Sequence, residues 1–95
     1  MTYNTEIKKA RSKIDKIDTA LLKQFNARQN TSKLIGSIKK KYGAKIHDQK
    51  RINALKRKWK AQARKMNLDE KDALKLLYFL IEYSRKAQKR NRFQN

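Results

Sequence analysis

YNTEIKKARSKIDKIDTALLKQFNARQNTSKLIGSIKKK, residues 3–41, is the stretch of sequence that decides the fold. It contains no proline, and Gly36 is its single glycine. Its apolar residues recur mostly at steps of three and four, which is the period of one face of an α-helix. They are Ile7, Ala10, Ile14, Ile17, Leu21, Phe25, Leu34, Ile35 and Ile38. The stretch therefore predicts one helix of about 38 residues, roughly 57 Å long.

A helix of this length is too long for the domain that carries it. A compact globule of 95 residues has a radius of gyration of about 12 Å. The helix must therefore project beyond its own domain, and the apolar stripe on the projecting part needs a cover. The simplest cover is a second copy, packed antiparallel or crossed about a twofold axis. We expect an intertwined homodimeric helical bundle.

Two shorter helices are predicted in the rest of the chain. Tyr42-Gly43-Ala44 breaks the first helix, and Gly43 suits a left-handed helix end. Asp48 and Asp69 are predicted N-caps of a second helix, ended by residues 66–68, and of a third that runs to about Arg92. The stripes of these helices are Ile52, Leu55, Trp59 and Ala63, then Ala73, Leu74, Leu77, Ile81, Ser84 and Gln88. The fold class is all-α, with residues 1–95 as a single domain.

The composition excludes several classes of site. The chain has no cysteine, so disulfide staples and thiolate zinc sites are ruled out. Its single histidine, His47, cannot assemble a His-rich metal site, and we expect no metal and no cofactor. No apolar run approaches the roughly 20 residues of a membrane span, and no apolar segment of a signal peptide follows the charged N-terminus. We expect a cytoplasmic protein.

The charge is the strongest anomaly of the composition. Lys and Arg number 27 against 8 Asp and Glu, which gives a formal net charge of +19. Such an excess is typical of proteins that bind nucleic acid, but here it is dispersed along all the helices and accompanied by no ladder of stacking aromatics. Specific nucleic-acid binding is therefore the second hypothesis. Weak, salt-sensitive, non-specific association is expected of any chain this basic.

Helical phase separates the cations of the first helix into two groups. Arg28 and Lys39 are 11 residues apart, about three full turns, so they project from nearly the same face and can flank one ligand. Arg11 precedes Arg28 by 17 residues, which is about 26 Å along the axis and roughly 100° around it. Arg11 therefore cannot reach the same small molecule, and we expect it to serve the site of a second chain.

Three segments of the chain resemble the all-α chorismate mutase family: ARSKIDKIDTALLKQFNAR (10–28), GSIKKKYGAKIHDQKR (36–51) and LIEYSRKAQ (80–88). The resemblance spans about Ile7 to Gln88. Members of that family are intertwined dimers of three-helix protomers, with two active sites shared between the chains. The resemblance implies the same assembly here. It also implies an isomerase of aromatic amino acid biosynthesis that converts the small dianion chorismate into prephenate.

For four residues the resemblance implies a catalytic role. Arg28 and the partner's Arg11 would pair with the carboxylates of chorismate. Lys39 would contact the ether oxygen and a carboxylate, and Gln88 would donate to the ether oxygen. This set suits the reaction, because the breaking C–O bond leaves partial negative charge on the ether oxygen and needs donors there. Forked pairs of Arg with carboxylate would hold the flexible enolpyruvyl arm over the ring.

Five further residues are expected to bind the substrate. Asp48 would lie near the ring hydroxyl, Arg51 would support the charge network and Ser84 would touch a carboxylate. Ser84 and Gln88 are four residues apart on the apolar stripe of the third helix, where polar side chains need partners. Ile35 and Ile52 would supply apolar walls.

Position 52 is where the chain departs from the family it resembles. Chorismate mutases of this family usually carry Glu there, and its carboxylate accepts a hydrogen bond from the ring hydroxyl. This chain has Ile52 instead. The related isochorismate-pyruvate lyases, similar in fold, have an apolar residue at that place, so salicylate formation is an alternative reaction. Asp48 favours the mutase, because the lyases lack an acid in that loop. Two non-enzymatic hypotheses stand beside these reactions: a basic helical module that binds nucleic acid, and a purely structural helical dimer.

Overall fold

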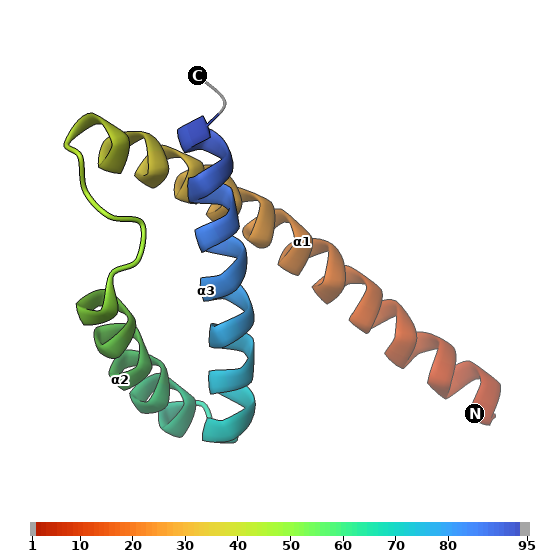
Figure 1. Ribbon diagram of the computed structural model, residues 1–95. Helices are drawn as coiled ribbons and strands as arrows, with labels where there is room; N and C mark the ends of the chain where they lie inside the picture. The colour runs from red at the N-terminus through yellow and green to blue at the C-terminus, as the bar shows by residue number, and fades with distance from the viewer. Residues whose placement is uncertain (1, 94–95) are drawn as a thin grey trace.

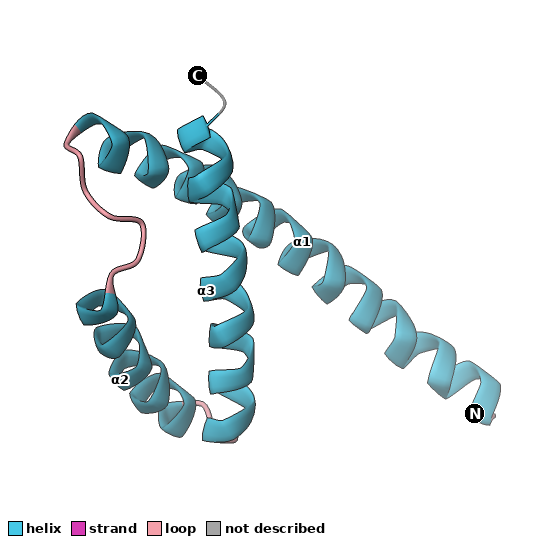
Figure 2. Cartoon of the chain, viewed as in Figure 1, coloured by secondary structure: helices cyan, strands magenta, loops and turns pink. Residues whose placement is uncertain are grey.

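The computed structural model describes residues 2–93, with side chains as far as residue 90, and over that range the chain forms three α-helices (Figure 1). α1 spans Tyr3–Lys41, α2 spans Gln49–Lys65 and α3 spans Glu70–Phe93. Only short connections separate them, and no strand occurs among these residues (Figure 2). The predicted all-α fold with a very long first helix is confirmed.

Aspartates begin both of the shorter helices, as predicted. Asp48 Oδ1 accepts a hydrogen bond from the backbone N–H of Arg51 at 3.0 Å. Asp69 Oδ1 accepts one from the backbone N–H of Asp72 at 3.1 Å. Each bond satisfies one of the donors that the first turn of a helix leaves unpaired. The two caps therefore fix where α2 and α3 begin.

The first two helices end in the same way, through a residue in the left-handed conformation. Gly43, with φ of 65°, is the residue predicted for this role after α1. Asn67, with φ of 56°, takes it after α2, where a short polar side chain tolerates the conformation. The N–H of Leu68 then donates to the carbonyl of Ala63 at 2.9 Å, the six-to-one bond of a Schellman ending. The chain turns there, so that α3 runs back along α2 (Figure 1).

α3 is the central helix of the fold, because α1 crosses it and α2 packs along it (Figure 1). The buried apolar core is small and consists mainly of alanine side chains that let the helices approach closely: Ala63, Ala73, Leu77 and Ala87. Ser32 of α1 and Gln88 of α3 are buried as well. The crossing of α1 over α3 is therefore partly polar, which is unusual for the centre of a small domain.

Gly36 is a point of close approach between the backbones of α1 and α3. It is buried, and a Cβ atom built on it would lie 2.6 Å from the carbonyl oxygen of Gln88 and 2.8 Å from its Cα. Both atoms belong to the backbone, so they cannot move aside without a shift of α3. A glycine is required here by the close approach of two backbones and not by its φ angle.

Replacing Gly36 with alanine should therefore lower the thermal unfolding temperature, although alanine is the better helix former by about 1 kcal/mol. Overpacking at a tight contact costs about 1–3 kcal/mol, which outweighs that gain. Asn30→Ala, on the exposed surface of α1, is the matched control and should not lower the transition. A higher unfolding temperature for Gly36→Ala would show that the two helices separate there without cost.

The first half of α1 projects away from the other two helices (Figure 1). The radius of gyration is 17.6 Å, against about 12 Å for a compact globule of this length. Large apolar side chains on this projecting half are 56–69% exposed: Ile14, Ile17, Leu21 and Leu22. The predicted projection of the first helix is confirmed. The second copy that would cover these side chains stays a prediction.

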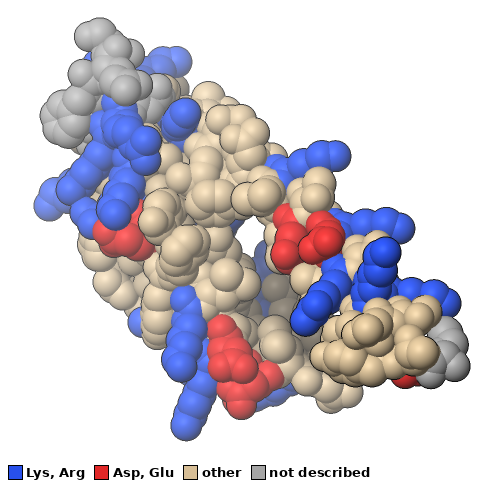
Figure 3. Space-filling view, turned by 90° about the vertical axis from the view of Figure 1, so that its right-hand side faces the viewer, with Lys and Arg blue, Asp and Glu red and all other residues tan. Residues whose placement is uncertain are grey.

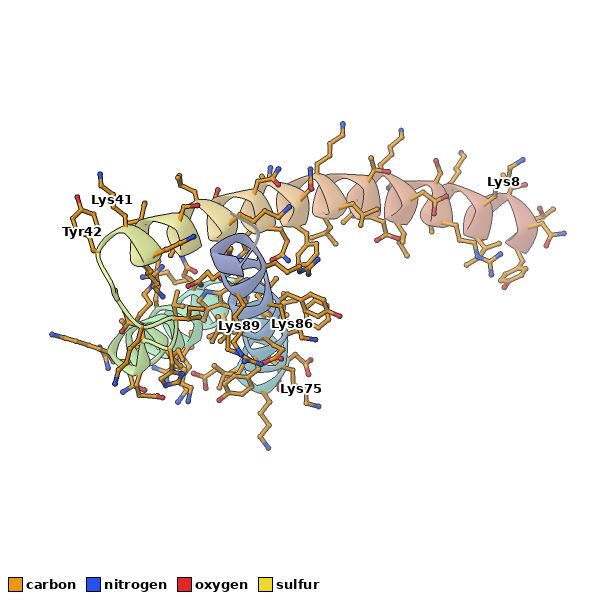
Figure 4. The ribbon with its side chains drawn as sticks, turned by 45° about the horizontal axis from the view of Figure 1, so that its top comes forward. Lys8, Lys41, Tyr42, Lys75, Lys86 and Lys89 are labelled. Carbon is orange, nitrogen blue, oxygen red and sulfur yellow. The ribbon has the colours of Figure 1, made fainter. Side chains whose placement is uncertain are left out.

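Positive side chains are spread widely over the surface. The face in Figure 3 shows separate groups of Lys and Arg with smaller acidic groups between them. In Figure 4, Lys8 lies towards one end of α1 and Lys41 at the other, while Lys75, Lys86 and Lys89 lie along α3. Within the described range no helix is both long and apolar enough to cross a membrane. The weak association with nucleic acid expected from this charge stays a prediction.

Candidate active site

A cavity of about 450 Å³ lies between the second half of α1, the connection after it, the start of α2 and the latter half of α3. That volume is within the range of small-molecule sites. Six polar residues predicted from the sequence line it: Arg28, Lys39, Asp48, Arg51, Ser84 and Gln88. The two predicted apolar walls, Ile35 and Ile52, line it as well. The structure thus brings together residues that are up to 60 positions apart in the chain.

Arg11 is the one predicted site residue that the structure keeps away from this cavity. It is exposed on the projecting half of α1 and does not line the cavity. This placement agrees with the helical phase, which put Arg11 out of reach of a ligand held by Arg28. Its service to a second chain stays a prediction.

Lys39 is held between the connection after α1 and the latter half of α3. Its Nζ donates to the carbonyl of Ile46 at 2.6 Å and to Oε1 of Gln88 at 2.8 Å. An ammonium group has three hydrogens to donate, so one remains for a ligand in the cavity. The two protein bonds fix the position of the charge before any ligand arrives.

The amide of Gln88 is oriented by its neighbours. Gln88 is 8% exposed, and its Nε2 donates to Oγ of Ser84 at 3.1 Å. Because the ammonium of Lys39 can only donate, the oxygen of the amide must face it and the NH₂ group must face the other way. Ser84 Oγ lies 2.7 Å from Oγ of the buried Ser32, which continues the network onto α1. One hydrogen of the amide goes to Ser84, and the second is available to a ligand.

Arg28 and Arg51 give the cavity uncompensated positive charge. Burial, and then the nearby charge of Arg51, lower the pKa of the Arg28 guanidinium from its ordinary value. Arginine nevertheless stays protonated in proteins, so the repulsion is not relieved by loss of a proton. Among the described residues no ion pair involves either guanidinium, and Arg28 Nη1 donates instead to the carbonyl of Leu80 at 3.2 Å. A bound anion would relieve this repulsion.

Among the residues whose side chains the structure describes, Asp48 is the single carboxylate that lines the cavity. Its Oδ1 caps α2, which orients the group and leaves lone pairs of both oxygens for further hydrogen bonds. Ile52 follows one turn later on α2 and presents an apolar side chain. No group of three or more potential metal ligands occurs in the described part of the chain. The lining thus combines several cations, neutral hydrogen-bonding groups and apolar walls, which suits a small dianion with an apolar body.

Several lining residues were not predicted. The polar ones are Thr31, Ser32, His47 and Arg85, and the apolar ones are Ile46, Leu55 and Ile81. The face of α1 that carries Arg28 and Lys39 also carries Ser32, four residues after Arg28, so its position could have been found from helical phase. Arg85 lies four residues after Ile81 on α3, and the same reasoning would have found it. Ile46 and His47 lie in the connection between α1 and α2, where no helical period could have indicated them.

The sequence matches the family model described as chorismate mutase type II over residues 10–89. No curated protein and no solved structure gave a significant match. The matched residues include all of those that line the cavity, as well as Arg11. The chain therefore belongs to the chorismate mutase type II family.

Proposed function

We propose that this protein is an isomerase that converts chorismate into prephenate. The observation that carries the proposal is the 2.8 Å hydrogen bond between Lys39 and Gln88, in a cavity where neither Arg28 nor Arg51 pairs with a carboxylate of the described residues. The family supports the same reaction. Neither the cavity nor the family match favours the lyase or the nucleic-acid module.

The reaction is a unimolecular [3,3] rearrangement, in which a C–O bond breaks and a C–C bond forms within one molecule. No proton is transferred, so no acid, base or nucleophile is required. The protein has two tasks. It must confine the enolpyruvyl arm over the ring in a chair-like geometry, and it must place donors at the ether oxygen, where negative charge develops.

Two donors are proposed for the ether oxygen. Lys39 has one hydrogen left after its bonds to Ile46 and Gln88, and Gln88 has one left after its bond to Ser84. Because both groups are already fixed by protein hydrogen bonds, little reorganisation is needed as charge develops during the reaction. The buried position of Gln88 keeps water from competing for the same oxygen.

The remaining polar residues are proposed to hold the substrate. Arg28 would pair with one carboxylate, for which Arg51 supplies supporting charge and Ser84 a further hydrogen bond. Asp48 would lie near the ring hydroxyl. The partner's Arg11 would pair with a carboxylate from the open side of the cavity. We therefore propose that the three-helix chain, acting as one domain, works as a homodimer with shared sites.

The direct test of the reaction is to follow the loss of chorismate absorbance together with the appearance of prephenate. Purified protein should accelerate both at the same rate. A rate no greater than that in buffer would refute the proposal. Conversion of isochorismate to salicylate and pyruvate by the same inactive preparation would establish the lyase instead.

Ile52 provides a second test of the substrate. It lines the cavity four residues after Asp48, where an acceptor for the ring hydroxyl is expected. Desolvating a hydroxyl without a partner costs about 1–3 kcal/mol, or roughly ten- to a hundredfold in rate or affinity. Ile52→Glu should therefore raise kcat/KM for chorismate by about tenfold or more, because Arg51 beside it keeps the new carboxylate ionised.

Ile52→Leu, which keeps the position apolar, is the matched control and should give no gain. If Ile52→Glu is slower with chorismate than the parent chain, the isoleucine is matched to its present ligand. That ligand would then be isochorismate, or the ring hydroxyl would find its acceptor at Asp48 alone.

A further inference from the structure

Arg85 is a cation of the cavity to which the proposed reaction gives no task. It lies on α3 directly after Ser84 and lines the cavity, yet 38% of its side chain is exposed. Its Nη2 donates to Oε1 of Glu82 at 2.7 Å. Glu82 does not line the cavity. Part of the donor capacity of the Arg85 guanidinium is therefore taken up by a carboxylate that lies outside the cavity lining.

The charge around the cavity favours the pairing of Arg85 with Glu82. Among the residues whose side chains the structure describes, three other cations line the cavity, Arg28, Lys39 and Arg51, against the single carboxylate of Asp48. A fourth cation turned inward would add to the repulsion that Arg28 and Arg51 already experience. A dianion in the cavity reverses this balance, because an inward cation is then attracted.

Glu82 would keep a cationic neighbour if Arg85 left it. Nζ of Lys86 lies 4.0 Å from the same Oε1 atom, on the next turn of α3. Both pairs are partly exposed, with 38–50% of each side chain accessible, and ion pairs open to solvent in this way are weak. Moving Arg85 from Glu82 to an incoming anion therefore costs little free energy.

We propose that Arg85 is a substrate-binding residue at the rim of the cavity. In this role Arg85 leaves Glu82 and pairs with a carboxylate of the incoming dianion. This inference rests on the proposed function and adds a binding residue to it. The role belongs to capture and binding, since Lys39 and Gln88 already serve the breaking bond. An interaction made equally with substrate and transition state changes KM and leaves kcat nearly constant.

The test compares Arg85→Gln with Arg64→Gln. Arg64 is the control because it too pairs with a glutamate, Glu70 at 2.9 Å, but does not line the cavity. Both variants remove one charge from the chain, so any effect of net charge alone is the same. At low salt, Arg85→Gln should raise KM for chorismate roughly two- to fivefold and change kcat by less than about twofold. Arg64→Gln should leave both constants unchanged.

Two further measurements, one at higher salt and one on a variant of Glu82, make the test more discriminating. The Debye length falls from about 30 Å at 0.01 M salt to about 3 Å at 1 M, so the KM difference should shrink as salt is added. Glu82→Gln removes the competitor for Arg85 and should lower KM, whereas Glu82→Gln combined with Arg85→Gln should match Arg85→Gln alone. If Arg85→Gln fails to fold, the KM of Glu82→Gln by itself still tests the inference.

Two results would overturn the inference. One is an equal change in KM for Arg85→Gln and Arg64→Gln, and the other is a KM for Glu82→Gln no lower than that of the parent chain. If the parent protein converts chorismate, either result refutes only the role of Arg85 and leaves the proposed function standing. Absence of chorismate turnover in the parent protein defeats the proposed function itself, so the two failures are distinguishable.

Discussion

Lys39→Ala is expected to lower the turnover of chorismate by about 10²- to 10³-fold, the usual effect of removing a donor aimed at developing charge. The substitution removes the ammonium that donates to both Ile46 and Gln88. It also leaves the amide oxygen of Gln88 without the cation that fixes its orientation. The loss should therefore appear mainly in kcat, because the ether oxygen becomes strongly charged only in the transition state.

The matched control for this prediction is Lys40→Ala, which removes the same charge from the neighbouring, exposed position. Lys40 does not line the cavity, and its variant should keep the parent rate. Thermal unfolding should show that both variants retain the fold, since Lys39 lies at the edge of the core and not within it. Parental activity in Lys39→Ala would mean that the ether oxygen is stabilised by other groups.

Much of the fold follows from local signals in the sequence. The proline-free repeat of residues 3–41 predicted α1 to its observed bounds. Gly43, Asp48 and Asp69 predicted the end of α1 and the starts of the two later helices, since each acts through neighbours within a few residues. Helical phase also placed Arg28 and Lys39 correctly on one face, because both lie on the same continuous helix.

Local signals in the sequence could not predict how the helices pack against one another. α1 and α3 cross at Gly36 and Gln88, 52 positions apart, and a lone glycine in a helical pattern says nothing about which backbone approaches it. That crossing buries Ser32 against Ser84.

Each of the variants Arg11→Ala and Arg28→Ala, alone, should lose most of its activity. Removing one partner of a buried charge pair costs about 2–5 kcal/mol, or roughly 30- to 5000-fold in kcat/KM. Arg28 lines the cavity, whereas Arg11 lies on the exposed half of α1. Loss of activity in Arg11→Ala without loss of fold would therefore place Arg11 in the site of another chain.

Refolding the two variants together distinguishes a shared site from a site within one chain. In a heterodimer with shared sites, one site receives both substitutions and the other receives intact Arg28 and the partner's intact Arg11. Random pairing makes about half of the dimers mixed, so about one quarter of the parental activity should return. If each site were confined to one chain, every site would keep its own substitution and no activity would return. An inactive mixture in which size-exclusion and mass measurements show heterodimers would therefore rule out the shared site, because the exposed apolar half of α1 would then join the chains without completing their cavities.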